Sequence, residues 1–188
     1  VRRDAGGRLA GGEARISCTL PEVFAHVKPG EKIWFDDGKI AGIVLETSAE
    51  DLRVRVVNAP PPGKKLRADK GINLPESRLD LPALTAKDLQ DLDFVARHAD
   101  MVGLSFVSRP ADIEDLQREL RARTSRPVGI VLKIETRRAF EQLPRLLLAA
   151  LGTEPVGVMI ARGDLAVECG YERLAEVQEE ILWMCEAA

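Results

Sequence analysis

The chain has 188 residues, of which 45% are hydrophobic and 30% charged, and its formal net charge is -3. This length allows one full domain and a small one, and the composition is that of a protein with a packed core, which excludes extensive disorder. Because 27 basic residues stand against 30 acidic ones and only 4% are aromatic, nucleic acid is not expected as a partner.

The first third of the chain is patterned as strands and turns. Residues 32–45 hold two apolar runs joined by Asp36-Asp37-Gly38, which predicts a β-hairpin because an Asp-Gly pair tolerates the positive φ of a tight turn. Residues 52–56 alternate with period two, as a strand with one exposed face does, and a run of prolines follows them. We therefore expect residues 1–70 to form a small β unit.

From Thr85 onward the pattern is that of helices alternating with buried strands. Thr85 and Asp88 have the spacing of a capping box, and apolar residues then recur at helical spacing. Three apolar runs follow at 101–107, 128–134 and 156–161, each too short for a buried helix, with amphipathic segments between and after them. The predicted order is α-β-α-β-α-β-α.

The spacing of these three runs restricts the architecture. Their starts lie 27 and 28 residues apart, close to the roughly 31 residues per unit of an eight-unit β/α barrel of about 250 residues, although a doubly wound parallel sheet gives a similar spacing. We expect residues 71–188 to form an α/β unit with a parallel sheet. If the sheet belongs to a barrel, three units are under half of it, and the strands need covering by the rest of a longer chain or by a partner.

Three further observations concern the location of the protein. The longest apolar runs are far shorter than the roughly 18 residues that span a bilayer, so we expect no transmembrane helix. Three cysteines without a C-x-x-C pair, together with two histidines, give no zinc-ligand spacing and fit a reducing cytoplasm. The chain has neither an initial Met nor an apolar signal region, which indicates processing or a piece of a longer protein.

Charged residues end the second and third predicted strands. Lys133 and Glu135 lie two residues apart and so share a face, and Asp164 follows Gly163 after the third strand. Sites in parallel sheets lie at the carboxyl ends of strands, and two carboxylates beside a lysine suit Mg²⁺ with a phosphorylated or enolic substrate. The structural alternatives are a strand-end ion pair that reaches water and a Gly-Asp turn that caps the next helix.

Two other patterns do not indicate chemistry. Gly63-Lys64 has neither the first glycine nor the hydroxyl residue of a P-loop, so we expect an exposed loop there. Ser105 is placed on the strand 101–107 without a histidine nearby in sequence, so no acyl-transfer site is expected.

Several segments, taken together and in order, resemble the pyruvate kinase family. The two strand ends, Lys133-Ile134-Glu135 and Met159-Ile160-Ala161-Arg162-Gly163-Asp164-Leu165, are similar to the family's signature strand ends. The upstream segments that resemble the family are Trp34-Phe35-Asp36-Asp37-Gly38-Lys39-Ile40, Lys70-Gly71-Ile72-Asn73-Leu74-Pro75, Asp80-Leu81-Pro82-Ala83, Lys87-Asp88-Leu89-Gln90-Asp91-Leu92 and Ser105-Phe106-Val107. The resemblance runs from about residue 30 to the end of the chain.

This resemblance implies a fold and a reaction. Residues 71–188 would be part of a (β/α)8 barrel of the TIM type, and residues 1–70 the later part of a small β lid domain. The activity implied is transfer of the phosphoryl group of phosphoenolpyruvate to ADP, giving pyruvate and ATP, with Mg²⁺ or Mn²⁺ and usually K⁺. A cytoplasmic, homo-oligomeric parent enzyme is also implied.

The resemblance further implies roles for individual residues. Lys133 matches the catalytic lysine, Glu135 and Asp164 match the ligands of the divalent metal, and Lys70 matches a nucleotide-contacting lysine. The residues that match the binding site for the substrate carboxylate are Ala161, Arg162, Gly163 and Asp164. The assignments of Lys133, Glu135 and Asp164 coincide with the candidate site inferred from the strand ends.

The chain departs from the family pattern and omits parts of it. The chain lacks counterparts of three parts of the family pattern, so we expect it alone to be inactive. These parts are the early barrel strands with the phosphate-binding arginine and the K⁺ ligands, the strand that would follow the third one, and the C-terminal domain. Thr136, Ala166, Cys169 and Glu76 stand where the family usually has other residues. These departures leave the substrate and efficiency of the parent open.

Two alternatives to a kinase remain. Ile134-Glu135-Thr136 and the segment 163–166 also resemble Mg²⁺-dependent aldolases and citrate-lyase-like carbon-carbon lyases, in which Glu135 and Asp164 would hold a metal that polarises a pyruvate enolate. Lys133 and the lid segment oppose the lyase. A non-catalytic, kinase-like binding domain is the other alternative, and the retained Lys133, Glu135 and Asp164 argue against it.

Overall fold

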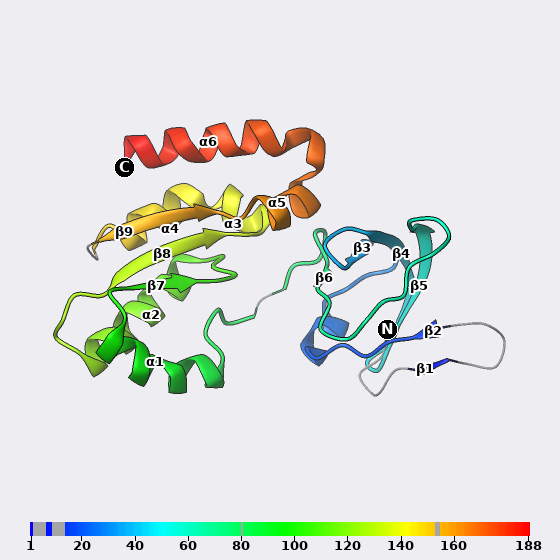
Figure 1. The fold of residues 1–188 in the computed structure, drawn as a ribbon, viewed down its shortest axis with the longest axis horizontal. Helices are drawn as coiled ribbons and strands as arrows, with labels where there is room; N and C mark the ends of the chain where they lie inside the picture. The colour runs from blue at the N-terminus through cyan, green and yellow to red at the C-terminus, as the bar shows by residue number, and fades with distance from the viewer. Residues whose placement is uncertain (2–6, 9–13, 80, 153–154) are drawn as a thin grey trace. The chain divides into compact units, whose positions relative to one another are not determined.

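A computed structural model describes residues 1, 7–8, 14–79, 81–152 and 155–188. The chain divides into two structural units, Val1–Asp80 and Leu81–Ala188, which are described separately here (Figure 1). The division falls at residue 80, beyond the expected boundary at 70, because the short strand β6 (Ile72–Asn73) pairs with a strand of the first unit.

The first unit is a four-stranded antiparallel sheet with additional short elements. The sheet has the strand order β5-β4-β3-β6. The elements are β1 (Gly7–Arg8), β2 (Ala14–Arg15), the 3-10 helix η1 (Pro21–Ala25), β3 (Lys32–Phe35), β4 (Ile40–Thr47) and β5 (Leu52–Asn58). The predicted hairpin is confirmed, because Lys32 pairs with Ile43 and Phe35 with Ile40 across β3 and β4.

The turn of this hairpin has the predicted backbone. Asp36, Asp37 and Gly38 have φ angles of 52°, 56° and 80°, a conformation that short polar residues and glycine tolerate. The unit has its own hydrophobic core beneath the sheet, because alternate residues of each strand point inward. The buried core residues are Val23, Phe24, Val27, Ile33, Phe35, Ile40, Val44, Leu52 and Leu74.

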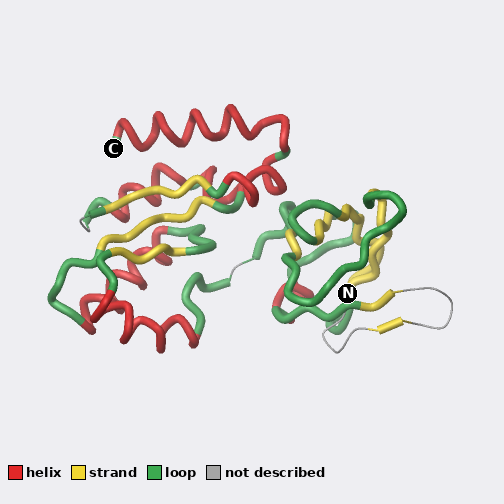
Figure 2. The backbone as a smooth tube through the Cα atoms, in the orientation of Figure 1, coloured by secondary structure: helices red, strands yellow, loops and turns green. Residues whose placement is uncertain are grey.

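The second unit alternates helices and parallel strands in the predicted order (Figure 2). Its three strands have the order β7-β8-β9, and all neighbours are parallel. The strands are β7 (Met101–Leu104), β8 (Gly129–Ile134) and β9 (Val156–Ile160). The helices are α1 (Ala86–His98), α2 (Pro110–Arg123), α3 (Arg137–Glu141), α4 (Leu143–Ala150), α5 (Arg162–Cys169), the 3-10 helix η2 (Tyr171–Arg173) and α6 (Leu174–Ala187). Within the described residues the parallel sheet has three strands and is not closed into a barrel.

The two faces of the parallel sheet differ. Ile130, Leu132 and Ile134 are fully buried among side chains of the helices. On the opposite face Met101 and Met159 are 59% and 48% exposed. The alternation predicted for β8 is therefore present. In the described part of the second unit, the sheet face that carries Lys133 has no helical layer.

The first parallel strand is shorter than predicted. We expected a strand over 101–107 that includes Ser105, but β7 ends at Leu104 and Ser105 lies in a turn. The chain turns there because Phe106 has a φ of 54°, which is outside the β region.

The capping box predicted at the start of α1 is confirmed. The Thr85 backbone N–H donates to an Asp88 carboxylate oxygen at 2.8 Å, and the Asp88 N–H donates to Thr85 Oγ1 at 3.2 Å. Both bonds satisfy N–H groups that have no partner inside the helix.

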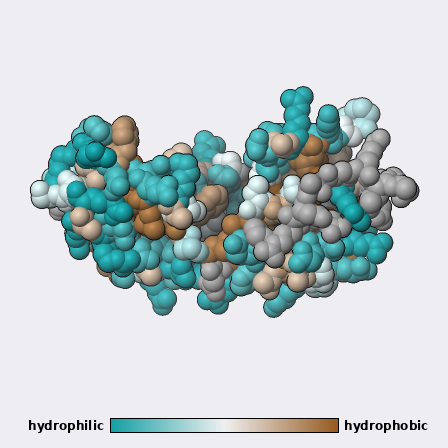
Figure 3. All heavy atoms as spheres, turned by 90° about the horizontal axis from the view of Figure 1, so that it is seen from below, coloured by the Kyte–Doolittle hydropathy of each residue, from teal (hydrophilic) through white to brown (hydrophobic). Residues whose placement is uncertain are grey.

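The surface in view is largely polar, in keeping with the 30% of charged residues in the sequence. Figure 3 shows mostly hydrophilic side chains on the face in view, with hydrophobic ones gathered in small groups. No helix in the described part of the chain is both long and apolar enough to cross a membrane. Cys18, Cys169 and Cys185 are free thiols.

Candidate functional site

The end of β8 carries an ion pair between Lys133 and Glu135. Lys133 Nζ lies 2.6 Å from Glu135 Oε1 and donates a second hydrogen bond to Ser105 Oγ at 2.8 Å. The Glu135 side chain is 6% exposed and that of Lys133 is 27% exposed, so the pair is only partly accessible to water. The structure thus brings together the two charged residues predicted for this strand end.

The backbone of the turn that follows β7 holds the Glu135 carboxylate in place. The Phe106 N–H donates to Glu135 Oε2 at 2.7 Å, and Phe106 has the positive φ that turns the chain after β7. Ser105 and Phe106 contact Lys133 and Glu135, and the strand pattern had given neither of them a place in the site. The signal that points to them is their position directly after the end of β7, at the same edge of the sheet as Lys133 and Glu135.

The end of β9 adjoins the end of β8. The Ala161 N–H donates to the Ile134 carbonyl at 3.1 Å, which extends the parallel ladder one residue beyond the paired Ile134 and Ile160. Glu135 and Ala161 therefore follow directly on paired positions of adjacent strands. Arg162, Gly163 and Asp164 come next, at the same edge of the sheet.

These three residues form the first turn of α5, where a turn was expected. Arg162, Gly163 and Asp164 are exposed, and a Cβ at Gly163 would meet no atom within 4 Å. Ala161 precedes the helix and is buried, and its carbonyl accepts a hydrogen bond from Leu165 at 2.9 Å. A helix that begins here offers backbone N–H groups and a favourable dipole to an anion.

The carboxylates at this edge fit a hard divalent cation in number and type. Mg²⁺ in proteins is commonly held by one or two carboxylates, with water and substrate oxygens completing its octahedron. Glu135 Oε1 contacts Lys133 and Oε2 accepts a hydrogen bond from Phe106, and both oxygens keep lone-pair capacity. Asp164 follows β9 in the turn that begins α5. No cluster of three or more metal-ligating side chains occurs among the residues that the structure describes.

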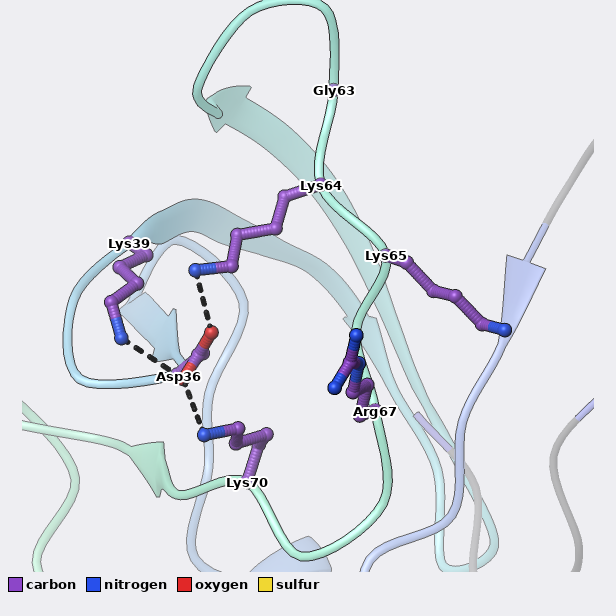
Figure 4. Close-up of a pocket in the computed structure, with 7 residues that line it drawn as sticks. All are labelled: Asp36, Lys39, Gly63, Lys64, Lys65, Arg67 and Lys70. Atoms are coloured by element: carbon purple, nitrogen blue, oxygen red, sulfur yellow. Dashed lines mark hydrogen bonds and ion pairs between the residues drawn. The ribbon is translucent and has the colours of Figure 1, made fainter.

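Lys70 belongs to the first unit and lies beside a different carboxylate. Lys70 Nζ is 3.1 Å from Asp36 Oδ1, Lys39 Nζ is 3.2 Å from the same oxygen, and Lys64 Nζ is 2.9 Å from Oδ2 (Figure 4). The Asp36 side chain is only 4% exposed. Three lysines from separate points of the chain thus converge on one buried carboxylate.

This convergence perturbs the ionisation of the cluster. The pKa of Asp36 is held well below its ordinary value of 3.8, chiefly by the hydrogen bond from Lys64 and also by those from Lys70 and Lys39, although burial opposes the shift. The pKa of Lys39 is raised, chiefly by its hydrogen bond to Asp36. Asp36 is therefore a carboxylate at every pH of physiological interest.

Comparisons with known proteins give consistent results. The family model described as pyruvate kinase, barrel domain, matches residues 3–188. A pyruvate kinase of Mycobacterium tuberculosis is 36% identical over 179 residues, which cover 95% of this chain and 36% of that protein. The pyruvate kinase of Clostridium perfringens is 29% identical over 184 residues, which cover 97% of this chain and 37% of that protein. The pyruvate kinase of Hypocrea jecorina is 37% identical over 163 residues, which cover 86% of this chain and 29% of that protein. The chain spans about a third of the length of these relatives.

Proposed function

We propose, because the chain belongs to the pyruvate kinase family, that its residues form part of an enzyme that transfers the phosphoryl group of phosphoenolpyruvate to ADP. The observation that carries this proposal is the Lys133–Glu135 pair, positioned by Ser105 and Phe106 at the carboxyl end of β8. That end of a parallel sheet is where catalytic residues of such folds are found.

In the proposed reaction the bond between phosphorus and the enol oxygen breaks, and a bond forms between phosphorus and a terminal oxygen of ADP. The enolate left behind takes a proton and becomes pyruvate. Lys133 has the charge and the exposure to stabilise both the transferring phosphoryl group and the developing enolate. Its hydrogen bond to Ser105 keeps the ammonium group at the strand end while substrate binds.

Other residues are proposed to bind the metal and the substrates. Glu135 and Asp164 would hold Mg²⁺ or Mn²⁺, and the metal would neutralise negative charge on the substrate. The backbone of Ala161, Arg162 and Gly163, with Asp164, would bind the substrate carboxylate at the start of α5. Lys70 would contact the nucleotide. K⁺ is proposed for the whole enzyme and is not assigned to residues of this chain.

The two units have proposed counterparts in the whole enzyme. We propose that the first unit is part of a β lid domain and that the second is part of a (β/α)8 barrel. We further propose that the whole enzyme is cytoplasmic and homo-oligomeric. This chain alone is expected to be inactive, since phosphoryl transfer requires several charged groups around the phosphate and Lys133 is the one cationic side chain assigned to it here.

The kinase is favoured over the two alternative functions. Each relative named above is a pyruvate kinase, which supports phosphoryl transfer over carbon-carbon cleavage. The intact Lys133–Glu135 pair supports a catalytic domain over a binding domain that has lost its site.

The test is Mg²⁺- and ADP-dependent formation of pyruvate from phosphoenolpyruvate by an enzyme that contains this chain. The Lys133→Ala variant is expected to lose activity by several powers of ten, as the removal of a key electrostatic group usually causes. The control is Lys87→Ala, which removes a lysine paired with Asp91 on the exposed surface of α1 and is expected to keep full activity. Absence of activity in the unaltered enzyme would contradict the proposal and favour the lyase or the binding domain.

A further inference from the structure

The loop between β7 and α2, residues 105–109, is fastened at its end by a buried carboxylate. The Asp112 side chain is 2% exposed, and its Oδ2 accepts hydrogen bonds from the backbone N–H groups of Ser108 and Arg109, both at 2.9 Å. Its Oδ1 accepts two more from the Arg109 side chain, at 3.0 and 3.3 Å. Because hydrogen bonds to a charged group are roughly twice as strong as those between neutral groups, Asp112 holds these two residues firmly.

These bonds go beyond what the start of a helix needs. Asp88 has the equivalent place in α1, as the third residue of the helix, and within the described part of the chain its carboxylate accepts hydrogen bonds only from Thr85, the residue that caps α1. Asp112 is the third residue of α2 and accepts from the capping residue Arg109, but it also accepts from Ser108, one residue earlier. The additional bond fixes the loop rather than the helix.

The middle of this loop has a strained backbone. Phe106 has a φ of 54°, which a residue with a bulky side chain rarely adopts. Phe106 is 65% exposed, so burial of its ring does not offset the strain, whereas the next residue, Val107, is fully buried. Strained residues persist where the surrounding structure determines their conformation, and they are frequent at functional sites. The anchored end of the loop, at Ser108 and Arg109, supplies such surroundings.

We propose that Asp112 is a positioning residue for the candidate site. By fixing the end of the loop it keeps Phe106 in the conformation that directs its backbone N–H to the Glu135 carboxylate, at 2.7 Å. Glu135, oriented in this way, pairs with Lys133 and is available to a metal. The inference rests on the proposed function, because it takes Glu135 as a ligand of the metal, and it assigns Asp112 no contact with metal or substrate.

The first test measures amide hydrogen exchange in the full chain by NMR and requires no activity. Asp112→Asn keeps the shape of the side chain but removes its charge, so exchange at the Phe106 N–H is expected to become about tenfold faster, with exchange along β8 unchanged. Asp88→Asn is the matched control, because it makes the same change at the same position of α1 and is expected to leave exchange at Phe106 unaffected. Unchanged exchange at Phe106 in Asp112→Asn, or an equal increase throughout the second unit, would contradict the proposal, since a residue that only stabilises the fold affects all of its N–H groups.

The second test is made with an enzyme that contains this chain. Asp112→Asn is expected to lower kcat about tenfold and to raise the Mg²⁺ concentration needed for half-maximal activity, with KM for ADP unchanged, because replacing a residue that orients a metal ligand commonly has an effect of this size. Phe106→Gly tests the route of the effect, since glycine adopts a positive φ without steric cost. In the Phe106→Gly background, Asp112→Asn is expected to lower kcat much less. An equal decrease in both backgrounds would show that Asp112 does not act through Phe106 and would overturn the proposal.

The outcomes separate this inference from the proposed function. If the unaltered enzyme forms no pyruvate, the proposed function is wrong, and exchange at Phe106 still decides whether Asp112 positions the loop. If the enzyme is active and Asp112→Asn matches Asp88→Asn both in kcat and in exchange at Phe106, the proposed function stands and this inference is wrong.

Discussion

The backbone N–H of Phe106 donates a hydrogen bond of 2.7 Å to the carboxylate of Glu135, which is 5% exposed. The turn after β7 and the end of β8 are therefore joined through the group proposed to bind a metal. Carboxylate ligands of metals are commonly oriented by such hydrogen bonds. A backbone donor fixes the position of the carboxylate without placing another side chain in the site.

Ser105 is predicted to position Lys133. Replacing it by alanine removes the 2.8 Å hydrogen bond to Lys133 Nζ and leaves the ion pair with Glu135. In an enzyme that contains this chain, kcat is expected to fall about tenfold with KM little changed, since one hydrogen bond to a charged group is lost. Steady-state kinetics check this, with Ser125→Ala on the exposed surface as control. Equal kcat values for the two variants would show that Ser105 does not position Lys133.

Substitutions of Lys133 and Glu135 are predicted to have non-additive effects on the free energy of unfolding. Lys133→Met leaves the buried Glu135 carboxylate with the Phe106 N–H alone and is expected to cost roughly 1–3 kcal/mol of unfolding free energy, because Lys133 is partly exposed. The double variant Lys133→Met, Glu135→Leu is expected to recover part of this loss. Urea unfolding of the full chain measures both, and a double variant less stable than the single one would contradict the prediction.

Asp36 is predicted to stabilise the first unit in a pH-dependent manner. Its pKa is lower in the folded state than in the unfolded one, so its contribution is complete above the unfolded value and is lost as the pH falls through the folded value. The Tm of Asp36→Asn is therefore expected to lie below that of the unaltered chain at pH 7. This Tm difference is expected to stay constant down to about pH 5 and to become smaller below about pH 4.

Thermal unfolding followed by circular dichroism between pH 2 and 7 tests this behaviour. Asp69→Asn is the control, because Asp69 is exposed with a φ of 60°, which asparagine also tolerates. A gap that is the same at pH 7 and at pH 2 would mean that the carboxylate charge of Asp36 is not what stabilises the fold.

Gly42 is predicted to be intolerant of a side chain. A Cβ there would lie 2.5 Å from Val54 Cγ1 and 3.2 Å from Ile33 Cγ2, between β3 and β5. Gly42→Ala is expected to destabilise the chain by roughly 1–3 kcal/mol, as overpacking of a well-filled core does. Gly71→Ala, whose Cβ would lie 3.9 Å from Asp37 Oδ1, is the control for the same Tm measurement. Similar Tm values for both variants would refute the steric argument.

Local patterns were sufficient to predict most of the secondary structure. The hairpin around Asp36, the capping box of Thr85 and the three parallel strands each depend on residues close in sequence. The end of β7 was predicted wrongly, because the positive φ of Phe106 is stabilised by a hydrogen bond to Glu135, which is distant in sequence. An apolar run alone contains no signal for such a contact.

The candidate sites were predictable to different degrees. Lys133 and Glu135 were paired correctly because strand alternation places both on one face. Asp36 was assigned only to a hairpin turn, and its role as the partner of Lys39, Lys64 and Lys70 could not be inferred from spacing. The lysines at 64 and 70 reach it from a loop whose path depends on the pairing of β6 with β3.

The separate cores of the two units have a consequence for fluorescence. The buried members of each hydrophobic cluster all come from one unit, and the sequence has two tryptophans, Trp34 on β3 and Trp183 on α6. Two units with independent cores need not unfold in a single transition. The tryptophan fluorescence of the unaltered chain would therefore combine the unfolding of the first unit with that of the second. Trp34→Phe and Trp183→Phe each leave one fluorophore, so the free energy of unfolding can be assigned to each unit within the intact chain.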